Sequence, residues 1–315
     1  MIGENKMKKA LAIILSICFV LCLTACSKNK TSNDVDSSTQ TEEKISFSTN
    51  SIDLTVGSTS PLKIETNIDI NKVVFSSSNE DIAKYFDGEV LGKNKGECTI
   101  IATTPNGTKA ECVVKVNAKV IYEGKCGENI TWKYLEDASL VFSGTGEMQE
   151  YYDDIWYQPA NVLIPWHTYS PWVKEIVIEE GITSIAAFAF IDCKACKKIT
   201  IPDSVSKIGY CAFEHWTNYE GFVLGKNITK LGALAFHSCN FDVYYEGTKA
   251  EFKNIVKIPP KSQGMGEYFW DEKTQTNVFV PYDDWDSKFE GKLLYYSETK
   301  QSDCWHYVDG VPTAW

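Results

Sequence analysis

Residues 173–240 repeat every 23 residues, and this regularity constrains the fold more than any other feature of the chain. Three stretches align without gaps: VKEIVIEEGITSIAAFAFIDCKA, CKKITIPDSVSKIGYCAFEHWTN and YEGFVLGKNITKLGALAFHSCN. The aligned apolar columns are Ile176, Ile199 and Phe222; Ile178, Ile201 and Leu224; Ile182, Val205 and Ile228; Ile185, Ile208 and Leu231; and Phe190, Phe213 and Phe236. No single unit can bury its apolar face alone, so neighbouring units must stack. The pattern predicts a solenoid with one continuous core and short parallel I-x-I strands along one side.

The second repeat, ITIPDSVSKIGYCAF, resembles the leucine-rich repeats of the BspA or treponemal type. The first repeat departs little from that pattern, whereas the third has VLGKN in place of the IPDS segment. The flanking stretches GKCGENITWKYLEDASLVFSGTGEMQEY and YYSETKQSDCWHYVDGVPTAW resemble the leader and closing segments of such proteins. The resemblance implies a leader over residues 119–172, repeats over 173–250 and a C-terminal cap over 251–315. It also implies a surface for binding proteins, because the family includes proteins implicated in attachment to host proteins or to other bacteria.

The capping segments contain their own strand signals. A strand is predicted at Leu140–Phe142, followed by a turn at Gly144 and Gly146, which would cover the first repeat. Further strands are predicted at 278–280 and 293–296, whereas residues 256–277 are irregular and predict a loop.

Residues 45–118 alternate apolar and polar side chains, which predicts several half-buried strands and a small β-sandwich. Asn106-Gly107 predicts a hairpin, because both residues tolerate positive φ. The segments LTVGSTSPL, FSSSNEDIA and GEVLGKNKGECTIIAT resemble the bacterial immunoglobulin-like group 2 domain, with Phe75 where that family usually has Trp. The resemblance implies a structural or adhesive module of cell-surface proteins. Cys98 and Cys112 flank the hairpin, either as a disulfide or as two buried thiols.

The N-terminus predicts export. MKKALAIILSICFVLCLTAC begins at Met7 and has an apolar run of sixteen residues, Ala10–Ala25. That run is shorter than the about 20 residues of a membrane span and is typical of a signal peptide. LTAC at its end resembles a bacterial lipobox, which implies cleavage after residue 25 and lipid on Cys26; an ordinary signal peptide that contains a cysteine is the alternative. Residues 1–26 are then the signal with its lipobox, and the polar residues 27–44 are a disordered tether.

These features predict a lipid-anchored protein that faces the outside of the cell. Its acyl chains would hold it in the bilayer. The formal net charge of −11 argues against a nucleic-acid partner, because proteins that bind nucleic acid concentrate positive charge.

No motif for catalysis, for a cofactor or for a metal site stands out, so we expect a protein that is not an enzyme and needs no cofactor. The CKAC motif at Cys193 and Cys196 falls on two columns of the repeat that are filled by Trp216 and Tyr219 in the second unit. Core packing is therefore the favoured interpretation of CKAC, with a disulfide or a metal site as alternatives.

Candidate binding residues are histidines and aromatic side chains. His215 and His237 follow the Ala-Phe pairs, 22 residues apart, and are interpreted as exposed loop residues that could also form a pair on one surface. The aromatic clusters EYYDDIWYQ and PWHTYSPW contain Trp156, Tyr157, Trp166 and Trp172, which could bind a ligand. Packing of Trp166 and Trp172 over the open end of the first repeat is the favoured interpretation.

The fold class expected from the sequence is mainly β, with an Ig-like sandwich followed by a short capped repeat solenoid. Two functions remain open. The first is a surface for protein binding and adhesion. The second is a carbohydrate-binding or substrate-capturing surface that uses the aromatic cluster around Trp156, Trp166 and Trp172. The partner is thus an extracellular protein or glycan.

Overall fold

The computed structural model describes residues 42–151, 164–258, 266–271, 276–281 and 289–315. The chain divides into two units, Met1–Glu42 and Glu43–Trp315, and the first lies almost wholly outside the described residues. The predicted signal peptide, most of the tether and Cys26 therefore lie outside them as well. Within the described residues, no helix is both long and apolar enough to cross a membrane.

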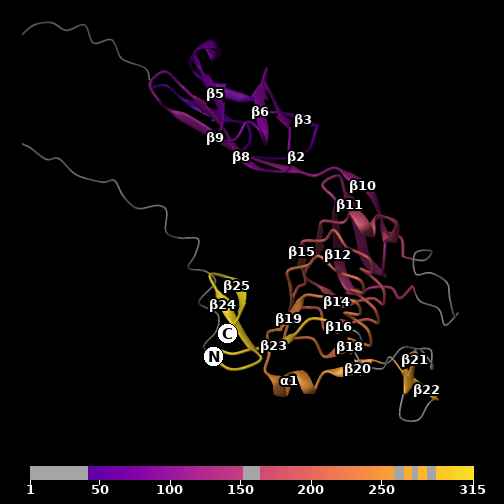
Figure 1. Ribbon diagram of the computed structural model, residues 1–315. Helices are drawn as coiled ribbons and strands as arrows, with labels where there is room; N and C mark the ends of the chain where they lie inside the picture. Colours follow the sequence, from indigo (N-terminus) through magenta and orange to yellow (C-terminus); the bar gives the residue numbers. More distant parts are fainter. Residues whose placement is uncertain (1–41, 152–163, 259–265, 272–275, 282–288) are drawn as a thin grey trace, which may run out of the picture. The chain divides into compact units, whose positions relative to one another are not determined.

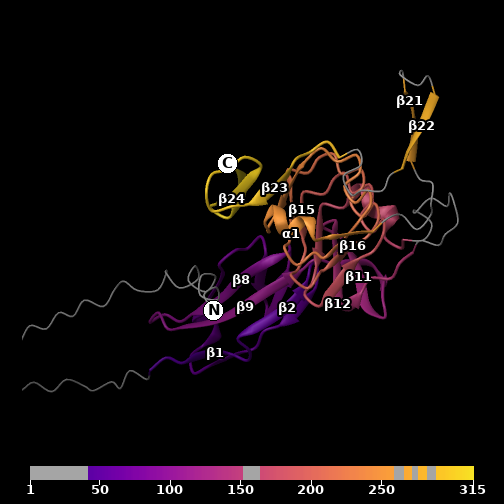
Figure 2. The ribbon, with the colours of Figure 1, turned by 90° about the horizontal axis from the view of Figure 1, so that it is seen from below.

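The structure is mainly β, as predicted (Figure 1). Residues 45–117 form three small sheets. A four-stranded sheet has the order β2 (Ser51–Thr55), β9 (Lys109–Asn117), β8 (Gly96–Thr103) and β5 (Val74–Ser77). In Figure 2, β2, β9 and β8 lie side by side. A three-stranded sheet has the order β3 (Thr59–Pro61), β7 (Glu89–Gly92) and β6 (Ala83–Phe86), and β1 (Ile45–Phe47) pairs with β4 (Ile64–Thr66). A short 3-10 helix spans Ile70–Lys72.

The four-stranded and three-stranded sheets share one apolar cluster, to which Leu54, Ala83, Val90 and Ile100 belong. Burial alternates strictly along β9, which confirms the predicted period of two. The predicted hairpin joins β8 to β9, and Gly107 has a φ of +92° there. Cys98 and Cys112 are buried thiols that lie opposite Val114 and Ile100 respectively, so they are not directly paired.

An antiparallel meander leads into the repeats. It consists of β10 (Val120–Lys125), β11 (Asn129–Leu135) and β12 (Ser139–Glu147). The turn predicted at Gly144 and Gly146 is wrong, because both glycines lie within β12. The strand continues because it changes partner: it pairs with β13 as far as Phe142 and with β14 at Gly146.

The repeats form two parallel ladders. The I-x-I segments give β13 (Glu175–Ile178) and β15 (Lys198–Thr200), in which Ile176 lies beside Ile199. A second ladder, which the sequence did not predict, consists of β14 (Ile182–Ile185), β16 (Lys207–Ile208), β18 (Lys230–Gly232) and β20 (Val256–Ile258). Its strands follow one another in this order in Figure 1. Residues 23 apart, such as Ile185 and Ile208, are partners in it, so the predicted alignment of the repeats is confirmed.

The first ladder is interrupted after the second repeat. Among the described strands, β15 pairs only with β13, and β17 (Gly221–Leu224) begins a separate sheet with β19 (Asp242–Tyr245), β23 (Leu293–Tyr296), β24 (Cys304–Val308) and β25 (Val311–Ala314). The predicted short parallel I-x-I strands are therefore present, but they belong to two separate sheets. Tyr219 explains the interruption. Its hydroxyl accepts a hydrogen bond from the Ile199 N–H at 3.3 Å, and it takes the place that a carbonyl of the next strand would have. The corresponding residue one repeat earlier is the much smaller Cys196.

The core nevertheless runs through all repeats, as predicted. Phe213 is fully buried, and its ring centroid lies 5.7 Å from that of Phe190 and 5.5 Å from that of Phe236. One cluster of buried residues extends from Cys126 in the meander to Ile255 beyond the repeats. The apolar columns are thus stacked side chains, which the 23-residue period requires.

The C-terminal part contains more regular structure than the sequence predicted. A short helix, α1 (Lys249–Lys253), begins with a capping box formed by Thr248 and Glu251. Strand β21 (Gly266–Asp271) pairs with β22 (Thr276–Pro281), so the loop predicted over 256–277 is wrong in part. Such a short run becomes a strand only through its partner, which local sequence does not reveal. The strands predicted at 278–280 and 293–296 are confirmed in β22 and β23.

Candidate functional site

The turns that contain the Ala-Phe pairs stack on one another through backbone hydrogen bonds. The N–H of Asp192 donates to the Glu214 carbonyl at 3.0 Å, and the N–H of His215 donates to the His237 carbonyl at 2.9 Å. Asp192, His215 and Ser238 occupy the same turn position and have positive φ values of 60°, 65° and 55°. Asp and His are among the residues that tolerate this conformation best. The turns therefore hold polar side chains at fixed positions on one face of the repeats.

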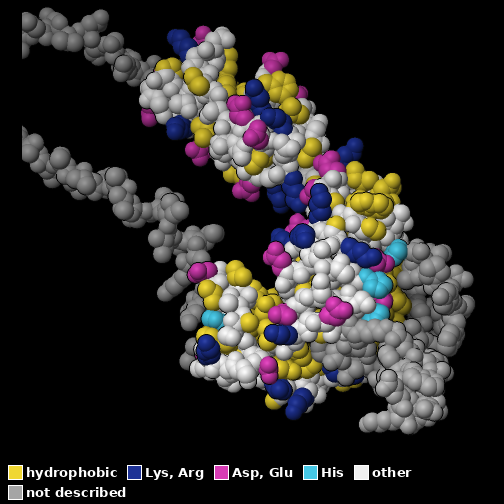
Figure 3. Space-filling model, in the orientation of Figure 1, with side chains coloured by type: hydrophobic (Ala, Val, Ile, Leu, Met, Phe, Trp, Pro, Cys, Tyr) yellow, Lys and Arg dark blue, Asp and Glu magenta, His cyan; other side chains and the backbone are white. Residues whose placement is uncertain are grey.

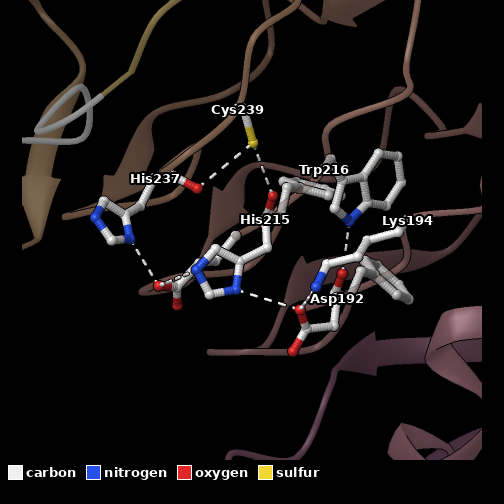
Figure 4. A network of polar contacts seen from close by, with 9 residues as sticks. Asp192, Lys194, His215, Trp216, His237 and Cys239 are labelled. Carbon is white, nitrogen blue, oxygen red and sulfur yellow. Dashed lines mark hydrogen bonds and ion pairs between the residues drawn. The ribbon is translucent and has the colours of Figure 1, made fainter.

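Two carboxylates and two histidines form a connected cluster on this face, which we call the histidine–carboxylate cluster. His237 Nδ1 lies 2.6 Å from Glu214 Oε1, and His215 Nε2 lies 3.6 Å from the same oxygen. The other ring nitrogen of His215, Nδ1, lies 3.2 Å from Asp192 Oδ1. Figure 4 marks this contact with a dashed line. Lys194 Nζ lies 3.0 Å from that Asp192 oxygen. Acid and imidazole groups thus alternate along three successive repeats.

The cluster is partly shielded from water. The side chains of Glu214 and His237 are 13% and 15% exposed, whereas those of Asp192 and His215 are 31% and 40% exposed. Its inner part is therefore enclosed by the fold and its outer part is open to solvent. In Figure 3, histidine side chains gather beside acidic ones on one side of the repeat region.

His167 lies near enough to Asp192 of this cluster to be affected by its charge. It begins a 3-10 helix, His167–Trp172. Burial lowers the pKa of His167, and the nearby charge of Asp192 partly opposes that change. His167 therefore favours the neutral form.

The sequence placed His215 and His237 correctly in the turns but did not identify their partners. Both side chains are partly buried rather than fully exposed, and their ring centroids are 6.0 Å apart. In the sequence the two histidines are 22 residues apart, one residue short of the repeat period. The informative spacing is 23, which relates Asp192 to His215 and Glu214 to His237. Titratable residues one full repeat apart are therefore the sequence signal that indicates this cluster.

The predicted aromatic site is only partly described. Trp166 is fully buried, and its Nε1 donates to the Ala189 carbonyl at 2.6 Å, so its prediction as a surface binding residue is corrected. Its ring packs against Phe142, with 4.8 Å between centroids, because it covers the end of the first repeat. Trp172 is 61% exposed and does not pack in this way. Trp156 and Tyr157 lie outside the described residues.

The CKAC cysteines are in the core. Cys193 and Cys196 are each 1% exposed. Burial raises the pKa of the Cys193 thiol and raises that of Cys196 to about 11, which keeps both protonated near neutral pH. A protonated thiol is a poor nucleophile and metal ligand. The burial predicted for this motif is confirmed.

A groove with a volume of about 390 Å³ lies at the interruption between β15 and β17, and we call it the strand-break groove. Its walls come from both strands, from the turn after β19 and from the β24–β25 hairpin. They include Thr200, Asp203, Val223, Asn227, Glu246 and Tyr307. The charged side chains among its described lining residues are Asp203 and Glu246, and both are acidic. Glu246 accepts a hydrogen bond from the Tyr307 hydroxyl at 2.9 Å.

Comparison with known proteins shows that one segment of the chain is similar to a family of repeats. Residues 168–263 match the family model of the BspA type leucine rich repeat region, in six copies. The crystal structure of a leucine-rich repeat protein from Eubacterium ventriosum is similar to 61% of this chain, with 19% sequence identity and a TM-score of 0.36. The similar part is 47% of that protein, so this chain spans about half its length. No curated protein matches the chain.

Proposed function

We propose that this protein is a non-enzymatic cell-surface lipoprotein that binds other proteins through its repeats. A repeat region of the BspA type suggests a protein-interaction surface. In this proposal Cys26 carries the lipid, and residues 27–44 form the tether. Residues 45–118 are then an immunoglobulin-like sandwich of the bacterial group 2 type, and residues 119–315 are a capped solenoid facing the outside of the cell.

The strand-break groove is the observation that carries the proposal. The facing edges of β15 and β17 pair with no other described strand. Tyr219 already binds the Ile199 N–H, so an extended segment of a partner would displace that hydroxyl and pair with these edges. Strand addition of this kind uses backbone hydrogen bonds for affinity and side-chain pockets for specificity. Because Asp203 and Glu246 line the groove, we expect the bound segment to carry a Lys or Arg side chain.

The test is a binding screen of the full chain against extracellular-matrix proteins and glycans, followed by Asp203→Lys. Charge reversal at the groove should weaken a saturable protein interaction. Glu180→Lys is a matched control, because Glu180 is the exposed acid at the same position one repeat earlier and does not line the groove. Equal loss of binding in both variants would reject the groove as the site. Absence of any saturable protein ligand would reject the proposed function.

Carbohydrate binding at the leader is the second candidate function, and the 61% exposure of Trp172 favours it. An exposed indole offers an apolar face on which a sugar ring can stack. Trp172→Ala should then abolish glycan binding without weakening binding of a protein ligand. The opposite result would assign the binding surface to the repeats alone.

A further inference from the structure

We propose that Glu214, His215 and His237 form a binding site for a divalent transition-metal ion, with zinc as the best fit. Their candidate ligand atoms all lie within 4.8 Å of one another, although they come from two different repeats. This site is separate from the strand-break groove, and the proposal does not depend on the proposed function. The sequence had predicted no metal site, because the three residues belong to no known metal-binding motif.

The distances suit tetrahedral coordination. Zinc binds imidazole nitrogen and carboxylate oxygen at about 2.0–2.2 Å, so ligand atoms around one ion are about 3.3 Å apart. Glu214 Oε1 lies 2.6 Å from His237 Nδ1 and 3.6 Å from His215 Nε2, values on either side of that separation. The ligand nitrogens of the two histidines lie within 4.8 Å of each other, so side-chain rotations would bring all three atoms to one ion. A fourth position would remain for water, toward the more exposed His215.

Asp192 provides the carboxylate that commonly accepts a hydrogen bond from a metal-bound histidine. A ligating imidazole commonly donates its other N–H to a carboxylate, which orients the ring and increases its basicity. His215 has Nδ1 at 3.2 Å from Asp192 Oδ1 and turns Nε2 toward Glu214. Asp192 is thus a positioning residue for His215, and Lys194 in turn contacts Asp192 at 3.0 Å.

The fold holds these groups in place before any ion binds. The backbone hydrogen bond from His215 to His237 fixes the spacing of the two repeats at this site. Glu214 and His237 share one column of the repeat, whereas Asp192 and His215 share the next.

The donor set selects the kind of ion. Two imidazole nitrogens and one carboxylate favour zinc and its first-row neighbours, whereas calcium and magnesium prefer ligand sets made of oxygen. The three ligands carry a charge of −1 when the histidines are neutral, so a divalent ion is only partly neutralised. Asp192 adds a second negative charge nearby, which the ion pair with Lys194 partly offsets.

The test measures zinc binding to the full chain, purified in mild detergent, by titration calorimetry with magnesium as the comparison ion. We expect one equivalent of zinc to bind saturably and magnesium to fail to compete. His215→Gln and His237→Gln should each weaken zinc binding by about 100-fold or more, and Asp192→Asn by about 10-fold or more. His306→Gln is the control, because the ring of His306 stacks on Trp315 at 3.6 Å and lies outside the cluster.

Two results would overturn the proposal. One is the absence of saturable zinc binding to the folded wild-type chain, and the other is unchanged zinc binding in both His215→Gln and His237→Gln. A measurement on the wild-type chain covers the case in which these variants fail to fold. The cobalt(II) complex of the wild-type chain should show d–d absorption bands and no thiolate-to-cobalt charge-transfer band. Appearance of the charge-transfer band would assign the ion to the cysteines instead.

Discussion

Gly232→Ala tests most directly how closely the repeats stack. Gly209 and Gly232 occupy the same position in successive repeats, 23 residues apart. A Cβ atom at Gly232 would lie 2.4 Å from the carbonyl carbon of Gly209 and 2.5 Å from the backbone nitrogen of Tyr210. Because both neighbours are backbone atoms, no side-chain rotation can relieve the contact. The two repeats would have to separate by about 1 Å to restore ordinary van der Waals contact.

The cost follows from what this separation disturbs. Overpacking in a core costs about 1–3 kcal/mol. The adjacent turns are joined by the hydrogen bonds from Cys211 N–H to Ala233 O at 3.2 Å and from Phe213 N–H to Ala235 O at 2.9 Å. Weakening each of them costs up to about 1 kcal/mol. We therefore expect Gly232→Ala to lower the free energy of unfolding by about 1–5 kcal/mol.

Urea unfolding followed by tryptophan fluorescence can measure this change. All nine tryptophans lie between Trp132 and Trp315, so the signal reports on the repeats and their flanking segments and not on residues 45–118. Gly225→Ala is the matched control, because the nearest atom to its Cβ would be Glu246 Oε2 at 3.9 Å. It should change stability by less than about 1 kcal/mol. Equal urea midpoints for the two variants would refute the argument from close backbone approach.

Three further predictions concern buried groups. Trp216→Phe leaves the Phe190 carbonyl without the indole N–H that now donates to it at 2.6 Å. It should cost about 1–3 kcal/mol in urea unfolding followed by circular dichroism, and an unchanged midpoint would contradict this. Burial raises the pKa of Cys193, so alkylation of the folded chain at pH 8 should label the partly exposed Cys304 before Cys193. Equal alkylation rates of the two cysteines in mass spectrometry would contradict this. His167 has a lowered pKa, so the unfolded chain binds its proton more readily, and stability falls as the pH drops below about 6.5. His167→Gln should lose less stability than the wild-type chain between pH 7 and pH 5, and an equal loss would argue against the lowered pKa.

Much of the architecture could be predicted from the chain. Ile185 and Ile208 lie side by side in the structure because equal spacing brings equivalent residues into register when units stack. The alternation along β9 and the hairpin at Gly107 were predictable for a similar reason, since both depend on local pattern. The burial of Cys193 and Cys196 followed from their columns, which accept Trp216 and Tyr219 elsewhere.

The candidate sites were less predictable, because they depend on contacts between repeats. Tyr219 occupies the same repeat column as Cys196, yet its hydroxyl binds the Ile199 N–H and interrupts the ladder. Nothing in the spacing of 23 distinguishes that joint from the one before it. Trp166 and Trp172 are six residues apart in the same aromatic segment, but one is buried and the other is exposed. Only the packing of the leader on the first repeat separates them.

The sequence by itself determined the period of the repeats, the apolar columns and the alternating strands of residues 45–117, because these depend on residue type and spacing along the chain. The tertiary structure decided where the ladder breaks and which polar groups meet. His215 and His237 are 22 residues apart, yet each faces a carboxylate 23 residues before it. The reason is physical: the stacking of the turns places side chains of the same column above one another, and the backbone hydrogen bonds between turns set how closely they approach.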